Sequence, residues 1–447
     1  MRGSESELTA TAPHRTPPGA GVVALLVVAA IVGLVLRAWV LSTPLGEADA
    51  DEAIVGLMAE ATLDGDVDAF YTGQAYGGSQ EALLTAIVFS VTGPSTLALK
   101  SVMVALSAVA VGLTWLVGRR TVGTAAAALG VAILWCGPPL AVWLTTKARA
   151  FYGLSTVLAL LGVLLCLRLV EEPRRRDAVL LGLAAGCAWW SSPQGAVIIA
   201  VAGAWALWRQ RAAVRLVGWT VGFALVGALP WLSYNLRNSW QSLDTPPSAD
   251  PSPAPERLAR LFTDTIPSFL GVRDHASDQW VSVPVAVVVL GALAVAVVWW
   301  AIRTRGDAAV ITWILLVFPV FYAANPFTSF AEARYVLVVA PFLALVVGSV
   351  ITSLLGDGRA PAAGFAIVAA LAVLAVVRLD ELSDRTVAAA AYHDVTPGEM
   401  DELIDAMVDA GVDHAWADYW TAPRLRFESG GDIVASGFGF YRDDDVL

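Results

Sequence analysis

The residues best suited to chemistry in this sequence are two adjacent carboxylates, Asp51 and Glu52, which follow the first long apolar run. The stretch Gly46–Glu60, GEADADEAIVGLMAE, holds five carboxylates and no basic residue. A carboxylate within hydrogen-bond reach of a hydroxyl can take its proton during attack, so Asp51 is a candidate general base. The alternative is structural, because Asp51 can also cap the helix that the following residues predict.

Further candidate binding groups lie in the same polar segment, residues 42–94. Two amphipathic helices suited to a membrane surface are expected there, DEAIVGLMAEATL and SQEALLTAIVF. A turn rich in glycine and tyrosine separates them and contains Gln74 and Tyr76, and Glu81 lies near the start of the second helix. Gln74, Tyr76 and Glu81 are therefore included as candidate substrate-binding residues.

Basic residues stand at the ends of two later apolar runs. Lys147 and Arg149 follow PPLAVWLTT, and Arg334 with Tyr335 begins RYVLVVAPF. Such cations are the partners that a phosphate group needs. Each has an alternative role as an anchor at the membrane interface, where long basic side chains extend toward water and aromatic rings gather. Arg334 can also pair with an acidic residue of a polar loop.

The composition is that of an integral membrane protein. Of 447 residues, 57% are hydrophobic and only 15% are charged, with a mean hydropathy of +0.67; soluble domains average about 25% charged residues. The run Gly21–Leu41 is long enough to cross a bilayer and lacks the small-residue site of a cleaved signal peptide, so we expect an uncleaved span. The net charge of −11 argues against a nucleic-acid partner.

Eleven transmembrane spans are expected, at 21–41, 95–118, 121–142, 151–170, 178–192, 194–208, 213–233, 282–302, 307–323, 335–355 and 361–378. The pair 178–192 and 194–208 is short and fits either two crossings or a re-entrant hairpin. If the N-terminus lies inside, every inner segment is basic, as in EEPRRRD and RQRAAVR. We therefore expect a multi-pass protein of the cytoplasmic membrane with its N-terminus inside and the acidic loops outside.

Three regions are expected along the chain. Residues 1–19 are polar and predicted to be a disordered cytoplasmic segment, and residues 20–378 form the membrane domain. Residues 379–447 hold sixteen acidic and four basic residues. There, Met400, Leu403 and Met407 share one helical face, and HAWAD and DIVASGF favour short strands. This part is predicted to be a small α/β appendage on the outer surface, leaning on the membrane domain or on other outer loops.

Several classes of site are not indicated. The sequence has no Walker loop, HExxH, GxSxG or glycine-rich dinucleotide turn. The three cysteines, Cys136, Cys166 and Cys187, lie in apolar runs without metal spacing, so no metal site is expected. Ion-coupled transporters usually carry ionisable residues at mid-span, whereas the candidates here stand at span ends. This distribution favours chemistry at the membrane surface over transport.

The motifs DEAIVGLMA, YTGQAYGGSQEA, GRRTVG (Gly118–Gly123) and ARYVLVVAPF (Ala333–Phe342) resemble the multi-span glycosyltransferases of the C-type fold. Those most similar are the dolichyl-phosphate-mannose protein mannosyltransferases and the lipid A aminoarabinose transferases, and the likeness covers the first ten spans. The resemblance implies an all-α polytopic membrane fold with about eleven transmembrane helices and interfacial helices in the first outer loop. The appendage does not match the β-trefoil insert of the eukaryotic mannosyltransferases.

The resemblance also implies an activity and roles for residues. A sugar would move, with inversion, from a polyprenyl-phosphate donor to an acceptor hydroxyl on the outer face, with Asp51 as base and Glu52 as its support. Lys147, Arg149 and Arg334 would bind the lipid phosphate. No cofactor is expected, and a divalent cation is not indicated. The partners would be the lipid-linked donor, membrane lipids, and a glycan, lipid or protein acceptor.

Two other functions remain open from the sequence. One is a transporter or flippase for a lipid-linked glycan, and the other is a non-catalytic scaffold whose appendage binds an envelope partner. The carboxylate pair Asp51 and Glu52 distinguishes the enzyme from both, because neither alternative needs a base at the membrane surface.

Overall fold

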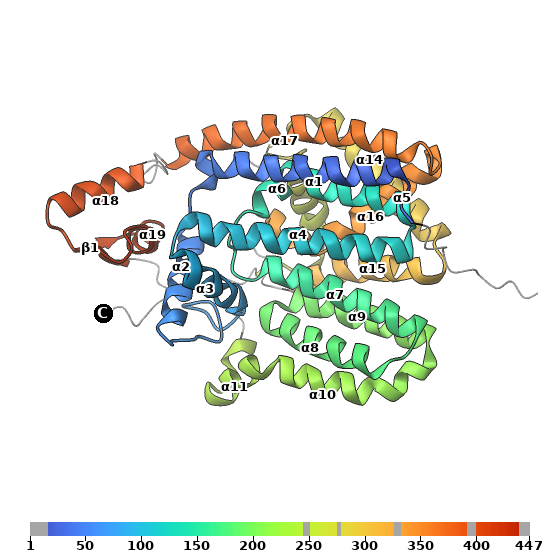
Figure 1. The fold of residues 1–447 in the computed structure, drawn as a ribbon, viewed down its shortest axis with the longest axis horizontal. Coiled ribbons are helices and arrows are strands. Elements are labelled where there is room, and N and C mark those ends of the chain that lie inside the picture. Colours follow the sequence, from blue (N-terminus) through green and yellow to red (C-terminus); the bar gives the residue numbers. More distant parts are fainter. Residues whose placement is uncertain (1–16, 245–250, 275–278, 326–331, 391–398, 438–447) are drawn as a thin grey trace, which may run out of the picture.

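The computed structural model describes residues 17–244, 251–274, 279–325, 332–390 and 399–437. Long helices lie side by side in a bundle, with short helices and a small sheet gathered at one end (Figure 1). The main bundle helices are α1 (Ala20–Leu41), α4 (Thr96–Thr121), α5 (Thr124–Cys136), α6 (Pro139–Leu144), α7 (Tyr152–Glu171), α8 (Arg175–Ser191), α9 (Pro193–Arg209), α10 (Val217–Gly227), α11 (Leu229–Arg237), α14 (Val283–Arg303), α15 (Ala309–Ala324), α16 (Ala340–Leu355) and α17 (Ala360–Ala390). The expected all-α polytopic architecture is confirmed.

The expected number of eleven spans is not reproduced. Within the described residues, six helices are long and apolar enough to cross a membrane, or seven if the pair α10 and α11, bent by 61°, is one span. Proline explains two of the differences. Pro230 in the first turn of α11 follows the bend, and Gly137 with Pro138 ends α5 after 13 residues, before the chain resumes as α6. The pair expected at 178–192 and 194–208 forms two 17-residue helices, α8 and α9, that both pack on α7.

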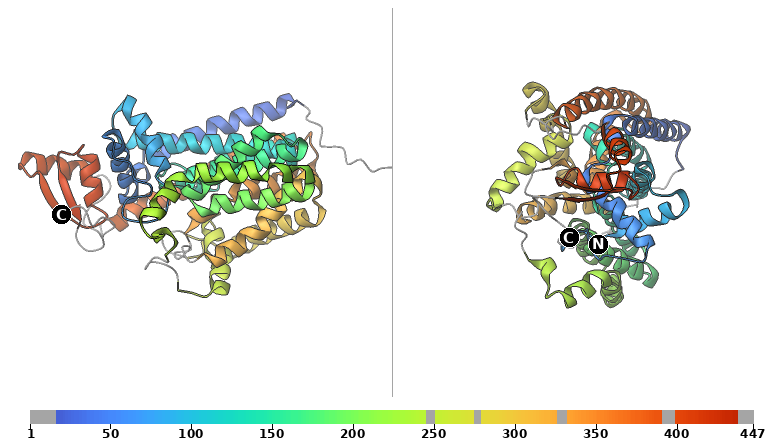
Figure 2. Two further views of the ribbon diagram at one scale, coloured as in Figure 1. Left: turned by 90° about the horizontal axis from the view of Figure 1, so that it is seen from below. Right: turned by 90° about the vertical axis from the view of Figure 1, so that its left-hand side faces the viewer.

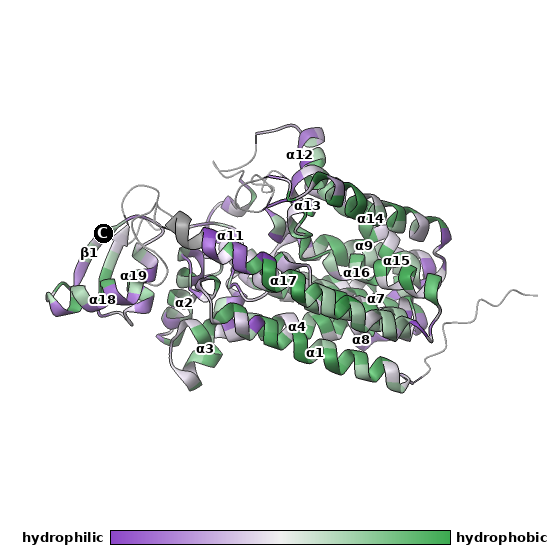
Figure 3. Cartoon of the chain, turned by 90° about the horizontal axis from the view of Figure 1, so that it is seen from above, coloured by the Kyte–Doolittle hydropathy of each residue, from purple (hydrophilic) through white to green (hydrophobic). Residues whose placement is uncertain are grey.

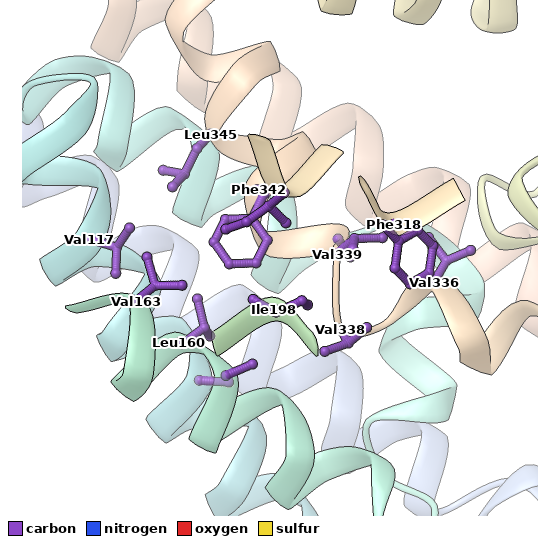
Figure 4. Packing of buried hydrophobic residues seen from close by; sticks show 14 of the residues in the cluster. Val117, Leu160, Val163, Ile198, Phe318, Val336, Val338, Val339, Phe342 and Leu345 are labelled. Atoms are coloured by element: carbon purple, nitrogen blue, oxygen red, sulfur yellow. The ribbon is translucent and has the colours of Figure 1, made fainter. Parts of the chain in front are cut away.

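Apolar side chains fill the interior of the bundle. The largest cluster joins α4, α7, α9, α15 and α16 through residues such as Val117, Leu160, Ile198, Phe318 and Phe342 (Figure 4). Hydrophobic residues also cover the outside of the bundle, whereas polar residues concentrate at the turns and in the appendage (Figure 3). Several valines of α14 are exposed. An apolar exterior of this extent fits a protein that is surrounded by lipid.

Small residues let neighbouring helices approach closely, as is common in membranes. One such contact is between α5 and α16. A Cβ atom added to Gly348 would lie 2.4 Å from the carbonyl oxygen of Ala126 and 2.6 Å from the backbone nitrogen of Gly130. The absence of a side chain at Gly348 therefore sets the spacing of these two helices.

Basic turns gather at the end of the bundle opposite to α2. Ion pairs join them there, between Arg120 and Glu171 (3.4 Å) and between Arg209 and Asp307 (3.8 Å). The two short helices predicted in the first polar segment form at the other end, as α2 (Ala50–Leu63) and α3 (Gln80–Thr92) (Figure 1). They pack on α4 through an apolar cluster that includes Val55, Phe89 and Leu99.

The C-terminal appendage has the predicted α/β composition. It contains α18 (Met400–Asp409), β1 (His414–Ala417), α19 (Ala422–Glu428) and β2 (Val434–Gly437), and it lies at the same end as α2 (Figure 2). The strands are parallel, with His414 opposite Val434. Parallel strands need a crossover, and here α19 provides it, in a stretch expected only to separate the strands.

The predicted boundary between residues 378 and 379 falls inside a helix. Helix α17 continues without a break beyond its apolar part to Ala390. Arg378 at the junction pairs with Glu381 on the same helix and with Asp274 at 3.4 Å, and Arg385 also pairs with Asp274. These ion pairs support the polar extension of α17 beyond its apolar segment.

We predict that Gly348→Ala lowers the free energy of unfolding by about 1–3 kcal/mol, because its methyl group meets backbone atoms that cannot move aside easily. Gly203→Ala in α9 is the matched control, since nothing lies within 4 Å of its added Cβ. The control should gain about 0.5–1 kcal/mol from helix propensity. Thermal unfolding in detergent measures both, and equal effects of the two changes would contradict the packing argument.

Candidate functional site

The first turn of α2 is fixed by a reciprocal pair of hydrogen bonds. The backbone N–H of Glu52 donates to Asp49 Oδ1 (3.0 Å), and the backbone N–H of Asp49 donates to Glu52 Oε2 (3.3 Å). This is a capping box, in which two otherwise unpaired donors at the helix start are satisfied. The cap is thus Asp49 and not Asp51, which the sequence had offered as a capping residue. The Asp51 side chain lies outside this cap.

Glu52 is the centre of a buried ion network. Its side chain has no exposed surface, and its Oε1 lies 2.6 Å from Lys100 Nζ while its Oε2 lies 3.1 Å from Lys147 Nζ. The backbone N–H of Ala148 donates to Oε1 at 2.8 Å. Burial raises the pKa of Glu52, but the charges of Lys100 and Lys147 outweigh burial and hold it below its ordinary value. Glu52 is therefore an ionised, enclosed counter-charge that fixes α2 to α4 and to the loop after α6.

Asp49 and Asp51 contact the loop after α6 from the water side of this network. Asp49 Oδ2 lies 2.7 Å from Lys147 Nζ and 2.9 Å from Arg149 Nη2. Burial raises the pKa of Asp49, but Arg149 and Lys147 together hold it well below its ordinary value. A carboxylate held so strongly in its ionised form is a weak proton acceptor. Asp49 is therefore a poor candidate base.

Asp51 is held by groups from three other parts of the chain. Arg149 Nη1 donates to its Oδ2 at 3.2 Å, and the hydroxyls of Tyr419 and Tyr71 donate to its Oδ1 at 2.7 and 3.4 Å. Its side chain keeps 17% of its surface exposed, whereas that of Glu52 keeps none. Of the predicted carboxylate pair, Asp51 is thus the member that a substrate can reach. We call Asp49, Asp51, Glu52, Lys100, Lys147 and Arg149 the polar cluster.

An apolar cavity lies beside the polar cluster. Apolar side chains make up most of its lining. The charged residues that line it are Arg37, Lys147, Arg149 and Arg334. A cavity of this kind suits a ligand with an apolar body and an anionic group.

Arg334 reaches the cavity from a short 3₁₀ turn before α16. Its guanidinium lies 2.8 Å from Glu332, 5.4 Å from the Tyr152 ring and 5.7 Å from the Tyr335 ring. Tyr335 is buried, and its ring stands 6.0 Å from that of Tyr152. The structure thus brings three of the predicted phosphate-binding residues, Lys147, Arg149 and Arg334, to one cavity.

Arg37 is a cationic residue that sequence reasoning missed. It lies in α1, almost fully buried, and donates to the carbonyls of Gly33 and Trp135 (3.0 Å each) and to Thr145 Oγ1 (2.9 Å). Its guanidinium stacks 3.6 Å from the Trp135 ring centroid. Within the described part of the chain no carboxylate lies at ion-pair distance from it. The signal was a lone arginine in an otherwise apolar run.

The remaining predicted binding residues have structural contacts. The amide of Gln74 donates to the carbonyl of Tyr76 (3.1 Å) and stabilises the turn between α2 and α3. The turn approaches the bundle closely at Gly77, where an added Cβ would lie 2.3 Å from the Phe151 ring and where φ is +74°. Neither Gln74, Tyr76 nor Glu81 contributes to the cavity lining. Their binding roles remain predictions.

Glu81 lies in the first turn of α3, and its side chain is buried against the start of α7. Its Oε1 accepts the backbone N–H of Leu154 at 2.8 Å. Burial raises the pKa of Glu81 to about 7, although the N–H groups of Leu154 and Gly153 act in the opposite direction.

In the described residues no group of three His, Cys, Asp or Glu side chains is arranged to hold a metal ion.

No family model and no curated protein matches this sequence. Solved structures do match. The chain is similar to ArnT from Cupriavidus metallidurans bound to undecaprenyl phosphate, with a TM-score of 0.64 and 16% identity over 95% of this chain and 87% of that one. The apo state of the same transferase gives a TM-score of 0.59, 14% identity and coverage of 93% and 85%.

An oligosaccharyltransferase of Archaeoglobus fulgidus, in complex with zinc and sulfate, is also similar. It gives a TM-score of 0.51 and 12% identity over 92% of this chain and 62% of that chain. At these identities the likeness establishes the fold. The resemblance to lipid A aminoarabinose transferases and the C-type glycosyltransferase fold, expected from the sequence, is thereby confirmed at the level of the fold.

We predict that Glu81→Gln changes how stability depends on pH. The pKa of Glu81 is about 7 in the folded protein against an ordinary value of 4.5, so the folded state retains a proton that the unfolded state loses. This contribution is complete at low pH and is lost as the pH rises through 7. The variant should match the wild type near pH 4.5 and exceed it at pH 8, by at most about 3 kcal/mol. Melting curves that stay parallel from pH 5 to pH 8 would exclude this assignment.

Proposed function

We propose that this protein is a membrane glycosyltransferase that moves a sugar from a polyprenyl-phosphate donor to an acceptor hydroxyl. Asp51 is the general base, and the cationic residues of the cavity bind the lipid phosphate. The shared fold with a transferase crystallised with undecaprenyl phosphate supports a donor of this class.

The observation that carries the proposal is the double role of Arg149. Its guanidinium contacts Asp51 at 3.2 Å, and the same side chain lines the apolar cavity. A phosphate bound in the cavity and a hydroxyl bound at Asp51 would therefore be separated by one side chain. Sugar transfer needs this proximity, because the acceptor oxygen must reach the carbon that the phosphate leaves.

Charge around the cavity favours an anion. Four cations, Lys100, Lys147, Arg149 and Arg334, are matched by four carboxylates, Asp49, Asp51, Glu52 and Glu332. Arg37 adds a positive charge that no carboxylate of the described residues matches within ion-pair distance. An unmatched charge in an apolar surrounding is costly, so a phosphate in the cavity would be stabilised.

The reaction follows as a single displacement. The acceptor O–H gives its proton to Asp51 as its oxygen bonds to the anomeric carbon of the sugar, and the bond from that carbon to the phosphate oxygen breaks. The phosphate leaves with the bonding electrons, and Arg149, Arg334 and Arg37 stabilise its charge. Attack opposite to the leaving group inverts the anomeric carbon. The apolar cavity would hold the first units of the lipid chain.

The distribution of basic residues supports an extracytoplasmic site. The turns with Arg120 and Arg209 lie at the bundle end opposite to α2, and positive turns face the cytoplasm in membrane proteins. The N-terminus would then be inside, and the polar cluster and the appendage would face outward, in the cell membrane.

We predict that Asp51→Asn lowers the rate of sugar transfer to a residual level, by at least about a hundredfold, because the amide cannot accept the proton. Purified protein is assayed with a panel of polyprenyl-phosphate sugars and acceptors. Asp64→Asn, an exposed position at the end of α2, is the matched control and should transfer normally. Glu52→Gln should instead lower the melting temperature, because it leaves Lys100 buried without its counter-charge.

Transfer by Asp51→Asn at a near-normal rate would reject Asp51 as the base. A wild type that moves lipid-linked glycan across vesicles but transfers no sugar would instead favour the flippase.

We predict that Arg334→Gln weakens the binding of polyprenyl phosphate by about tenfold to a hundredfold, since one charge-assisted contact to the phosphate is lost. Arg303→Gln is the control, because Arg303 lies in the last turn of α14, at the basic end of the bundle and not at the site. Binding is measured by titration in detergent. Equal affinities of the two variants would contradict the assignment of Arg334 to the phosphate.

A further inference from the structure

We infer that the C-terminal appendage completes the active site by supplying Tyr419, a positioning residue that fixes the orientation of the Asp51 carboxylate. The inference rests on the proposed function, because it assigns Tyr419 a role through the proposed base. It concerns a residue 368 positions away in the sequence, in a part of the chain that the sequence suggested only as a leaning appendage.

The contact between the two side chains is direct. The Tyr419 hydroxyl donates to Asp51 Oδ1 at 2.7 Å, a short bond to a charged acceptor. Arg149 donates to the other oxygen, Oδ2, at 3.2 Å. The two donors come from different loops and bind different oxygens of the carboxylate, so together they oppose its rotation. Tyr71 reaches Oδ1 only at 3.4 Å and also bonds the Asp51 backbone carbonyl at 3.1 Å.

The loop that carries Tyr419 is held by its own hydrogen bonds. Asp418 Oδ1 accepts the backbone N–H groups of Trp420 (2.8 Å) and Thr421 (3.0 Å), and the Asp418 carbonyl accepts the N–H of Ala422 (2.9 Å), where α19 begins. An aspartate that bonds the backbone two and three residues ahead is a common turn device. The position of Tyr419 between β1 and α19 is therefore set locally.

Packing fixes α19 on the helix that carries Asp51. Phe427 is buried, and its ring lies where a Cβ at Gly56 of α2 would be 2.4 Å away. The same ring stands 6.2 Å from Phe89 of α3 in a stacked arrangement. Gly56 is thus the position on α2 that admits the appendage. Figure 2 shows the appendage at the α2 end of the bundle.

The loop bonds and the packing together connect Tyr419 to the helix that carries Asp51. Tyr419 is rigid with respect to α19, and α19 is packed on α2. The hydroxyl therefore keeps its place relative to Asp51, and it acts as a fixed support for the base. A base pre-oriented in this way does not have to be ordered during the reaction, which lowers the barrier to proton transfer.

The test is the variant Tyr419→Phe, which removes only the hydroxyl. We expect kcat for transfer to fall by about tenfold to a hundredfold while the KM for the donor stays unchanged, since Tyr419 does not line the donor cavity. Trp416→Phe, an exposed position on β1 with 64% of its surface accessible, is the control in the same appendage and should transfer normally. Phe427→Ala should reproduce the loss in kcat by loosening the docking.

A double variant separates positioning from a general structural effect. In an Asp51→Asn background, Tyr419→Phe should cost nothing further, because its effect passes through the carboxylate. Normal transfer by Tyr419→Phe, or a further loss in the double variant as large as in the single one, would overturn the inference. A wild type that transfers no sugar from any donor refutes the proposed function, and this inference with it. A wild type that transfers, with Tyr419→Phe unaffected, refutes this inference alone.

Discussion

The arrangement of the site depends on one buried carboxylate. Glu52 accepts from Lys100 and the N–H of Ala148 at Oε1, and from Lys147 and the N–H of Asp49 at Oε2. A carboxylate offers about four acceptor positions, and these four donors use them. Since a buried charge without partners costs several kcal/mol, α2, α4 and the loop after α6 must meet at this point. The positions of Asp51 and Arg149 follow from it.

The only two lysines of the chain both bind Glu52, although the chain has 28 basic residues. The chemistry of the two cations accounts for this choice. The ammonium group of lysine is a compact point charge, so two of them fit around a single carboxylate. The planar guanidinium of arginine favours a bidentate contact instead. Arginine occurs instead at the edge of the cavity, where the proposed phosphate would present several oxygen atoms.

Much of this site could be predicted from the sequence, and the rest depended on packing. The membrane class, the helices α2 and α3, and the proximity of the Asp51–Glu52 pair to Lys147 and Arg149 follow from apolar runs and from which loops share a face. The cap at Asp49 was visible as a D-x-x-E pattern but was assigned two residues later. The expected count of eleven spans is not confirmed, because proline and glycine interrupt apolar runs and hydropathy does not register a bend. The contact of Tyr419 with Asp51 joins segments 368 residues apart, and no local pattern encodes it.

The membrane explains why these parts concentrate at one end of the bundle. A lipid phosphate stays at the surface of the bilayer while its chain stays within it, so a site for it must join an apolar cavity to a polar surface. In this fold Arg149 stands at that junction, since it lines the cavity and binds Asp51. While no donor is bound, the carboxylates neutralise the cations and keep them in place. Arg37 gives the cavity one positive charge in excess. An anion can then enter without disrupting the network around Glu52 that holds Asp51, the proposed base.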